Sequence, residues 1–387
     1  MSANISRHTG QFEQYPIWPE GTPDFPTVEQ IYEYLNAYAE HFKLHPHIQY
    51  DAEVVELHPN ETRWELCWKR GGESHTDQFD HVIVATTKFS MPSIPAIEGM
   101  DTLPEQTAIH SAYYRTPESF KDQRVLVVGG SFSGTSIAEE LAEAGVEVIH
   151  SFRKKRWLVP RYISPDVSHL EQKLPRDVLY YPQNPNKLVD LEHYEYMREH
   201  CGEQNYIEEL RIALDAHAGM TIADTYLDQI GSGKLLPIAS GIKCFHGNQV
   251  TFLDGREERF DKIIFSTGFT QKGYLPFLPA ALQEQVYSYS LYEDMFSPDF
   301  PNIALNGFYL GPRAASFPIF EKQGEYAAAI FSGRALLPSP DEMREAIRTR
   351  PTKSPSHTDY VKGLVAQSLF SRAQDAAVTG ASLNKMQ

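Results

Sequence analysis

The spacing of apolar residues changes several times along the chain, and each change predicts a different kind of element. After Thr27, apolar residues recur at helical spacing from Ile31 to Phe42. Residues 27–30 have the Thr-x-x-Gln pattern of a capping box, and Pro46 sets a limit that a helix should not cross. We therefore predict a helix that begins near Thr27 and ends before Pro46.

Between residues 48 and 90 the pattern changes to that of strands. Residues 48–57 and 63–68 are predicted as strands of a meander, with a turn at Gly71 and Gly72. The apolar run within residues 79–87 predicts a buried strand that ends in a loop.

Another buried strand is predicted at residues 125–128, where four apolar residues follow one another. The chain then turns through a glycine-rich segment, shows helical spacing from Ile137 to Ala142, and reaches a second apolar run at 146–149. A buried strand, a tight glycine turn and a helix N-terminus together form a cradle for phosphate groups. This order predicts a nucleotide site formed by Gly129, Gly130, Ser131, Phe132, Ser133 and Gly134.

The turn departs from the full G-x-G-x-x-G fingerprint of dinucleotide sites. Gly129 and Gly134 hold the first and third glycine positions, whereas Ser131 holds the middle one. The middle glycine lets the backbone approach the pyrophosphate, so we expect Ser131 to push the phosphates outward or to weaken binding. A tight strand–helix turn without a ligand is the alternative interpretation.

Arg153 follows the second strand of this unit, where NAD-binding proteins place an acidic residue on the ribose 2′-hydroxyl. Residues 151–156 contain no acid. A guanidinium can form a bidentate pair with a 2′-phosphate, so Arg153 favours NADP(H) over NAD(H). A solvated basic loop is the alternative.

The amino-acid composition indicates which kinds of binding partner and which cellular compartment to expect. The formal net charge of −16 argues against a nucleic-acid partner or an anionic membrane surface. The three cysteines are too widely spaced for a redox pair or a zinc framework, no metal site is expected, and reduced thiols suit a cytoplasmic protein. No apolar run of about 18 residues occurs, so we expect no integral membrane span. At 387 residues the chain suits two domains.

Several segments, taken in order, resemble the flavin-containing monooxygenases of class B, the N- and S-oxygenating type. Residues 129–137 resemble the NADPH turn of this family, and Tyr114 matches the N/S-oxygenating form rather than the Baeyer–Villiger form, which has Trp. The resemblance covers residues 4 to 333. The other matching segments are residues 80–87 with Pro92 and Pro95, 109–115, 157–161, 264–269 and 317–323.

The resemblance implies an α/β fold with two Rossmann-like, doubly wound, three-layer nucleotide-binding domains. Residues 1–90 and 262–340 would form a discontinuous FAD-type domain, residues 91–261 an inserted NADPH-type domain, and residues 341–387 a C-terminal tail. Asn4 stands where the family has its active-site asparagine. Cofactor contacts are implied for Val54, Thr86, Thr267, Gly268 and Gln323.

The resemblance also implies a function. NADPH would reduce FAD, dioxygen would give a C4a-hydroperoxyflavin, and an amine nitrogen or a sulfide sulfur of a small molecule would take the distal oxygen. A thiol–disulfide flavoreductase is disfavoured because the chain has no cysteine pair.

The largest departure from the family concerns its opening strand, GxGxxG turn and helix, which hold the FAD pyrophosphate. That unit would precede Met1, so we expect the FAD-type domain to be incomplete at its N-terminus, and an exposed core there would favour a homo-oligomer. The alternative function is therefore a truncated or degenerate relative that binds NADP(H) or a partner without oxygenase activity.

Overall fold

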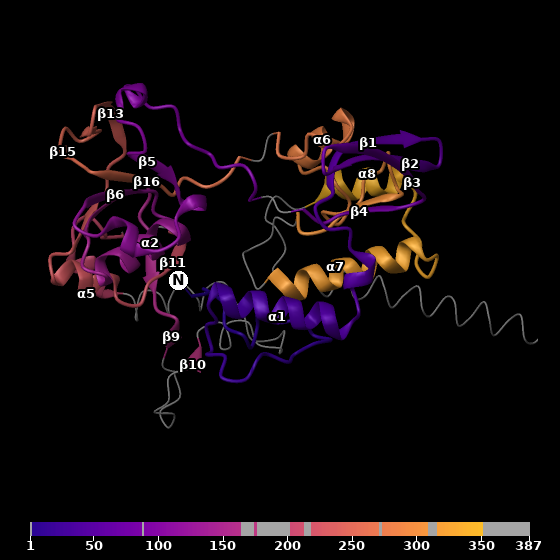
Figure 1. Cartoon of the computed structure of the whole chain (residues 1–387), viewed down its shortest axis with the longest axis horizontal. Helices are drawn as coiled ribbons and strands as arrows, with labels where there is room; N and C mark the ends of the chain where they lie inside the picture. The colour runs from indigo at the N-terminus through magenta and orange to yellow at the C-terminus, as the bar shows by residue number, and fades with distance from the viewer. Residues whose placement is uncertain are drawn as a thin grey trace, which may run out of the picture. The chain divides into compact units, whose positions relative to one another are not determined.

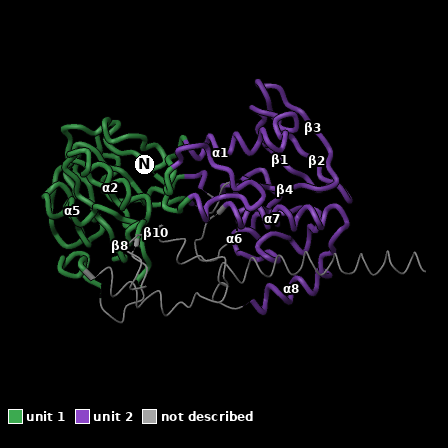
Figure 2. Tube along the Cα trace, turned by 90° about the horizontal axis from the view of Figure 1, so that it is seen from below, with its two compact units in different colours: residues 1–6, 23–29, 92–269 green, residues 7–22, 30–91, 270–387 purple. Residues whose placement is uncertain are grey.

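A computed structural model describes most of the chain as two compact units, each of which brings together distant parts of the sequence (Figure 2). Unit 1 comprises residues 1–6, 23–29 and 92–269, and unit 2 comprises residues 7–22, 30–91 and 270–387. The residues described are 2–86, 89–163, 174–175, 202–212, 218–270, 273–308 and 316–350.

Unit 1 is built on a five-stranded sheet in the order β12-β7-β6-β16-β5, in which every neighbouring pair is parallel. Strands β5, β6 and β16 of this sheet are labelled in Figure 1. Parallel strands share one carboxyl edge, where α/β proteins bind their ligands. The strands are β5 (Ala108–His110), β6 (Arg124–Val128), β7 (Glu147–Ser151), β12 (Leu235–Ile238) and β16 (Lys262–Phe265).

Both faces of this sheet are covered, which explains why β6 is apolar at every inner position. Val125 and Val127 pack on one face with Ile137 and Leu141 of helix α2 (Phe132–Glu143). Leu126 packs on the other face in a second cluster. Successive side chains of a strand point to opposite faces, so only a continuous apolar run can serve a strand that is buried on both.

Smaller elements surround the sheet of unit 1. Strands β13, β14 and β15 form an antiparallel meander, and β8 pairs with β11 in parallel. These elements are β8 (Trp157–Val159), β9 (Tyr162–Ile163), β10 (Leu174–Pro175), β11 (Met220–Ile222), α5 (Tyr226–Gly231), β13 (Ile242–His246), β14 (Gln249–Phe252), β15 (Glu257–Arg259) and the 3₁₀ helices η2 (Met100–Thr102), η3 (Ser111–Tyr113), η4 (Pro117–Phe120) and η5 (Gly202–Tyr206).

The described residues of unit 2 form an antiparallel meander, a short parallel pair, four α-helices and one short 3₁₀ helix. Trp64 and Leu57 of the meander are fully buried in its core. The elements are α1 (Val28–His41), η1 (His45–His47), β1 (Glu53–Asn60), β2 (Arg63–Arg70), β3 (Glu73–Phe79), β4 (Val82–Val84), α6 (Ala280–Tyr287), β17 (Ile303–Leu305), α7 (Ser316–Phe331) and α8 (Pro340–Thr349).

The predicted α/β class and the first helix are confirmed, since α1 lies between Thr27 and Pro46. The meander has a third strand, β3, that the sequence did not predict. Its residues are almost all exposed and polar, so no apolar alternation marks it. None of the helices in the described ranges is long and apolar enough to cross a membrane.

The structure moves the domain limits that the sequence suggested. Residues 262–265 were assigned to the FAD-type part, but they form β16, which is hydrogen-bonded between β6 and β5 in unit 1. Residues 1–6 and 23–29 also belong to unit 1. Residues 341–349 of the predicted C-terminal tail belong to helix α8 (Pro340–Thr349), and the tail from residue 351 lies outside the described residues.

Candidate nucleotide-binding site

The glycine turn predicted from the sequence joins the carboxyl end of β6 to the first turn of α2. The first N–H groups of a helix have no partner within it and carry the positive end of its dipole, so this end attracts phosphate. Gly129 has φ of 120°, a conformation that side chains rarely adopt. The turn therefore has the backbone form of an anion cradle.

Three glycines of the turn are fixed by close approach. A Cβ on Gly129 would lie 2.3 Å from the carbonyl oxygen of Ser266, and one on Gly134 would lie 1.7 Å from the carbonyl oxygen of Gly129. A Cβ on Gly130 would lie 2.6 Å from Cβ of Phe152. These contacts bring β6, β16, α2 and the end of β7 together at one point.

Ser131 occupies the helix N-cap with φ −103° and ψ −173°. This is extended backbone that any residue adopts, so the serine introduces no backbone strain at the middle position of the fingerprint. Its side chain makes no capping hydrogen bond.

The end of β16 lies beside the turn, because β16 and β6 are neighbours in the sheet. Ser93 binds this end twice: its N–H donates to Gly268 at 2.9 Å, and its carbonyl accepts from the hydroxyl of Thr267. The predicted cofactor residues Thr267 and Gly268 thus share the carboxyl edge of the sheet with the glycine turn.

Arg153 follows β7 and is exposed, and its aliphatic stem lies over Gly241, where a Cβ would meet its Cγ at 3.2 Å. Lys154 and Arg156 line a small pocket with Gly130 and His150. This basic segment beside a helix N-terminus suits an additional phosphate group.

His150, on β7, ties the turn to the rest of unit 1. Its Nε2 lies 2.9 Å from the carbonyl oxygen of Gly129 and its Nδ1 lies 2.6 Å from the hydroxyl of Tyr226. A carbonyl oxygen can only accept, so Nε2 carries the proton and Nδ1 accepts from Tyr226. Both residues are about 1% exposed. The neutral tautomer therefore fits both contacts.

Burial lowers the pKa of His150 to about 4, although its bond to Gly129 acts in the opposite direction. Burial also raises the pKa of Tyr226 well above its usual value. Both groups therefore stay uncharged at neutral pH. No sequence pattern marks this pair, because a histidine within a buried strand and a tyrosine 76 residues later share no periodicity or motif.

The other predicted residues lie in different places. Asn4 belongs to unit 1 and its Oδ1 is buried without a hydrogen-bond partner among the described residues. In unit 2, Val54 lies at a bulge of β1 and Thr86 is exposed after β4, whereas Gln323 is fully buried in α7. Oε1 of Gln323 accepts from the N–H of Gly307 at 2.8 Å.

The residues expected to bind NADP(H) lie together in unit 1, whereas those expected to bind FAD are divided between the two units. The turn at the N-terminus of α2 and the exposed Arg153 fit the phosphate groups of NADP(H), and the three glycines allow this turn because a Cβ at each would collide with neighbouring protein atoms. The residues expected at FAD do not form a site within one unit, because Thr267 and Gly268 belong to unit 1 and Val54, Thr86 and Gln323 to unit 2. The FAD contacts of these five residues therefore stay predictions.

Comparison with known proteins gives one family over nearly the whole chain. Residues 1–373 match the model described as flavin-binding monooxygenase-like. Flavin-containing monooxygenase 5 of Rattus norvegicus is 29% identical, over 92% of this chain and 70% of that protein. A 4-hydroxybenzoate brominase (decarboxylating) of Marinomonas mediterranea is 30% identical, over 84% of this chain and 63% of that protein.

A solved structure has the same fold. The crystal structure of cyclohexanone monooxygenase from Rhodococcus sp. Phi1 bound to NADP⁺ aligns with a TM-score of 0.71 at 18% identity. The alignment covers 96% of this chain and 89% of that one. At this identity the likeness concerns the fold.

Replacement of Gly134 by alanine should open the glycine turn. The new Cβ cannot remain 1.7 Å from the Gly129 oxygen, so α2 must move away from β6. We expect the dissociation constant for NADP⁺ to rise by about tenfold or more, measured by titration calorimetry. Gly231→Ala is the matched control, because nothing lies within 4 Å of its Cβ position. Equal NADP⁺ affinity in both variants would contradict the assignment.

His150 should make stability depend on pH. Its pKa is about 4 in the folded chain and near 6.5 in the unfolded chain, so between these values the unfolded chain binds the extra proton. Stability is therefore fully present above pH 6.5 and is lost as the pH falls towards 4. From pH 7 to pH 5 this amounts to about 2 kcal/mol.

Urea unfolding of His150→Gln should show a weaker loss of stability over this pH interval than the parent chain. The exposed His47→Gln variant is the control and should keep the parent's slope. If both variants keep the parent's slope, His150 is not the group responsible.

Proposed function

The chain belongs to the flavin-binding monooxygenase-like family, and from this premise we propose that it uses NADPH and dioxygen to oxygenate a small molecule. The atom that receives oxygen would be a soft nucleophile, an amine nitrogen or a sulfide sulfur. Flavin, when bound, supplies the activated oxygen in such chemistry, and NADPH supplies the electrons.

The observation that carries this proposal is the glycine turn of unit 1. A Cβ at Gly129, Gly130 or Gly134 would collide with neighbouring atoms of unit 1, so only glycine permits this turn, which ends at the N-terminus of α2. In the proposed function the N–H groups of this turn bind the pyrophosphate of NADPH. Arg153 binds the 2′-phosphate with its guanidinium.

Asn4 supplies the contact nearest the reaction in this proposal. Its Oδ1 is buried and lacks a hydrogen-bond partner among the described residues. A buried acceptor left unpaired costs about 1–3 kcal/mol, so a bound ligand that offers an N–H or O–H group would recover that energy. Asn4 would thus orient a reacting ligand rather than transfer a proton.

The purified chain provides the experiment that tests the function. We expect the visible absorbance of oxidised flavin, NADPH consumption that needs dioxygen, and an N-oxide or S-oxide when a tertiary amine or a thioether is added. A colourless protein that binds NADP⁺ and consumes no NADPH would overturn the oxygenase proposal and favour a nucleotide-binding relative without oxygenase activity.

Arg153→Ala tests the choice of nucleotide. Loss of a charge-assisted contact to the 2′-phosphate should weaken NADPH binding by about tenfold to a hundredfold and leave NADH binding nearly unchanged. Binding of both nucleotides is followed by nicotinamide fluorescence. Lys121→Ala removes an exposed cation of the same unit and serves as the control. An equal loss for NADPH and NADH would mean that Arg153 does not contact the 2′-phosphate.

A further inference from the structure

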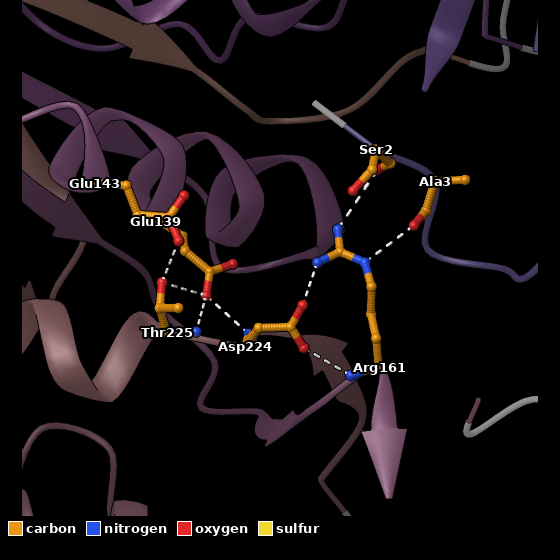
Figure 3. Close-up of polar contacts among 7 residues, drawn as sticks. All are labelled: Ser2, Ala3, Glu139, Glu143, Arg161, Asp224 and Thr225. Atoms are coloured by element: carbon orange, nitrogen blue, oxygen red, sulfur yellow. Dashed lines mark hydrogen bonds and ion pairs between the residues drawn. The ribbon is translucent and has the colours of Figure 1, made fainter. Parts of the chain in front are cut away.

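Arg161 and Asp224 form an ion pair at the ends of two neighbouring strands. Strands β8 and β11 are parallel, with Ile222 opposite Val159, so the residues two positions beyond each strand come side by side. The backbone N–H of Arg161 donates to Oδ1 of Asp224 at 2.8 Å, and its guanidinium donates to Oδ2 at 2.5 Å (Figure 3).

The same guanidinium holds the first residues of the chain. Nε of Arg161 donates to the carbonyl of Ala3 at 3.0 Å, and a terminal nitrogen lies 3.5 Å from the carbonyl of Ser2 (Figure 3). The Arg161 side chain is only 14% exposed. A planar fork with five N–H donors can bind a carboxylate and two carbonyls at once, which an ammonium cannot do in the same geometry.

A second segment, residues 23–29, completes this attachment. Ala3 donates its N–H to the carbonyl of Pro26 at 2.8 Å, and the Arg161 guanidinium lies over the ring of Phe25 at 5.7 Å. The hydroxyl of Tyr162, the next residue after Arg161, donates to Asp24 at 3.2 Å. Residues 2–6 are therefore held from two sides within unit 1.

Asp224 is itself fixed by the helix of the nucleotide turn. Its backbone N–H donates to Oε1 of Glu139 on α2 at 2.8 Å, and the same oxygen accepts from the N–H of Thr225 (Figure 3). Glu139 is 6% exposed, and burial raises its pKa despite these donors. A continuous set of hydrogen bonds thus runs from α2 through Asp224 and Arg161 to Ala3, which precedes Asn4.

We propose that Arg161, oriented by Asp224, is a positioning residue that sets the place of Asn4 by holding the carbonyls of Ser2 and Ala3. The Oδ1 of Asn4 is buried and accepts no hydrogen bond from the described residues. A small shift of the Asn4 backbone would therefore turn this oxygen away from the ligand that it is proposed to contact. The inference rests on the proposed function, because that function gives Asn4 its contact with the reacting ligand.

The decisive test is a double-mutant cycle in the full-length chain. Arg161→Lys keeps the positive charge but loses the planar guanidinium with its several N–H donors. Asn4→Ala removes the side-chain amide whose position is in question. With N,N-dimethylaniline and thioanisole as probes, Arg161→Lys should lower the product formed per NADPH consumed by about tenfold and leave the NADP⁺ dissociation constant unchanged. In the Asn4→Ala background the same change should have no further effect.

Arg124→Lys is the matched control. Arg124 also pairs with carboxylates in unit 1, those of Glu147 and Glu258, but it contacts no carbonyl of residues 2–6. Its product yield should equal that of the parent chain. An equal fall of yield in both Asn4 backgrounds, or a changed NADP⁺ affinity in Arg161→Lys, would overturn the positioning role.

Hydrogen exchange separates this inference from the function on which it rests. If the parent chain forms no product, the proposed function fails. Amide hydrogen exchange then still tests whether Arg161 holds residues 2–6 in place. Loss of the charged donor at the carbonyl of Ala3 should loosen residues 2–6, so the Ala3 N–H, which donates to Pro26, should exchange about tenfold faster in Arg161→Lys than in Arg124→Lys. The amides of residues 129–134 should keep the parent's rate. Unchanged exchange at Ala3 would overturn the inference.

Discussion

The carbonyl of Gly129 is the point on which unit 1 depends. Helix α2 approaches it so closely that residue 134 has no room for a Cβ, and His150 donates to it from the neighbouring strand. One backbone oxygen thus fixes the end of β6, the start of α2 and a buried side chain of β7. Close packing of this kind permits little adjustment of the turn.

The parallel register of the strands supplies the second constraint. Because the strands of the main sheet share one carboxyl edge, the glycine turn, Arg153 and the end of β16 come to the same edge although they are far apart in sequence. Strands β8 and β11 are also parallel, so the residues that follow them lie side by side, and Arg161 is placed next to Asp224. The residues to which we propose functions in unit 1 therefore lie near the ends of parallel strands.

Several polar contacts of unit 1 are buried and paired, so they can position other groups. His150 is neutral and uses both ring nitrogens, and Glu139 accepts from several donors. Buried polar groups that are satisfied hold a specific geometry, whereas unsatisfied ones cost energy. Among the described residues of unit 1, a few buried polar atoms lack a hydrogen-bond partner, and the Oδ1 of Asn4 is one of them.

The sequence by itself determined the strand, glycine turn and helix of residues 124–143, because a buried parallel strand and a turn that excludes Cβ atoms both require particular residue types. It also predicted α1 and the α/β class, and its motifs led to the family. Only the tertiary structure decided that β16 belongs to the sheet of unit 1, that His150 holds Gly129, and that Arg161 holds Ala3. These contacts join residues 21 to 158 positions apart, and no local period or motif records such pairings.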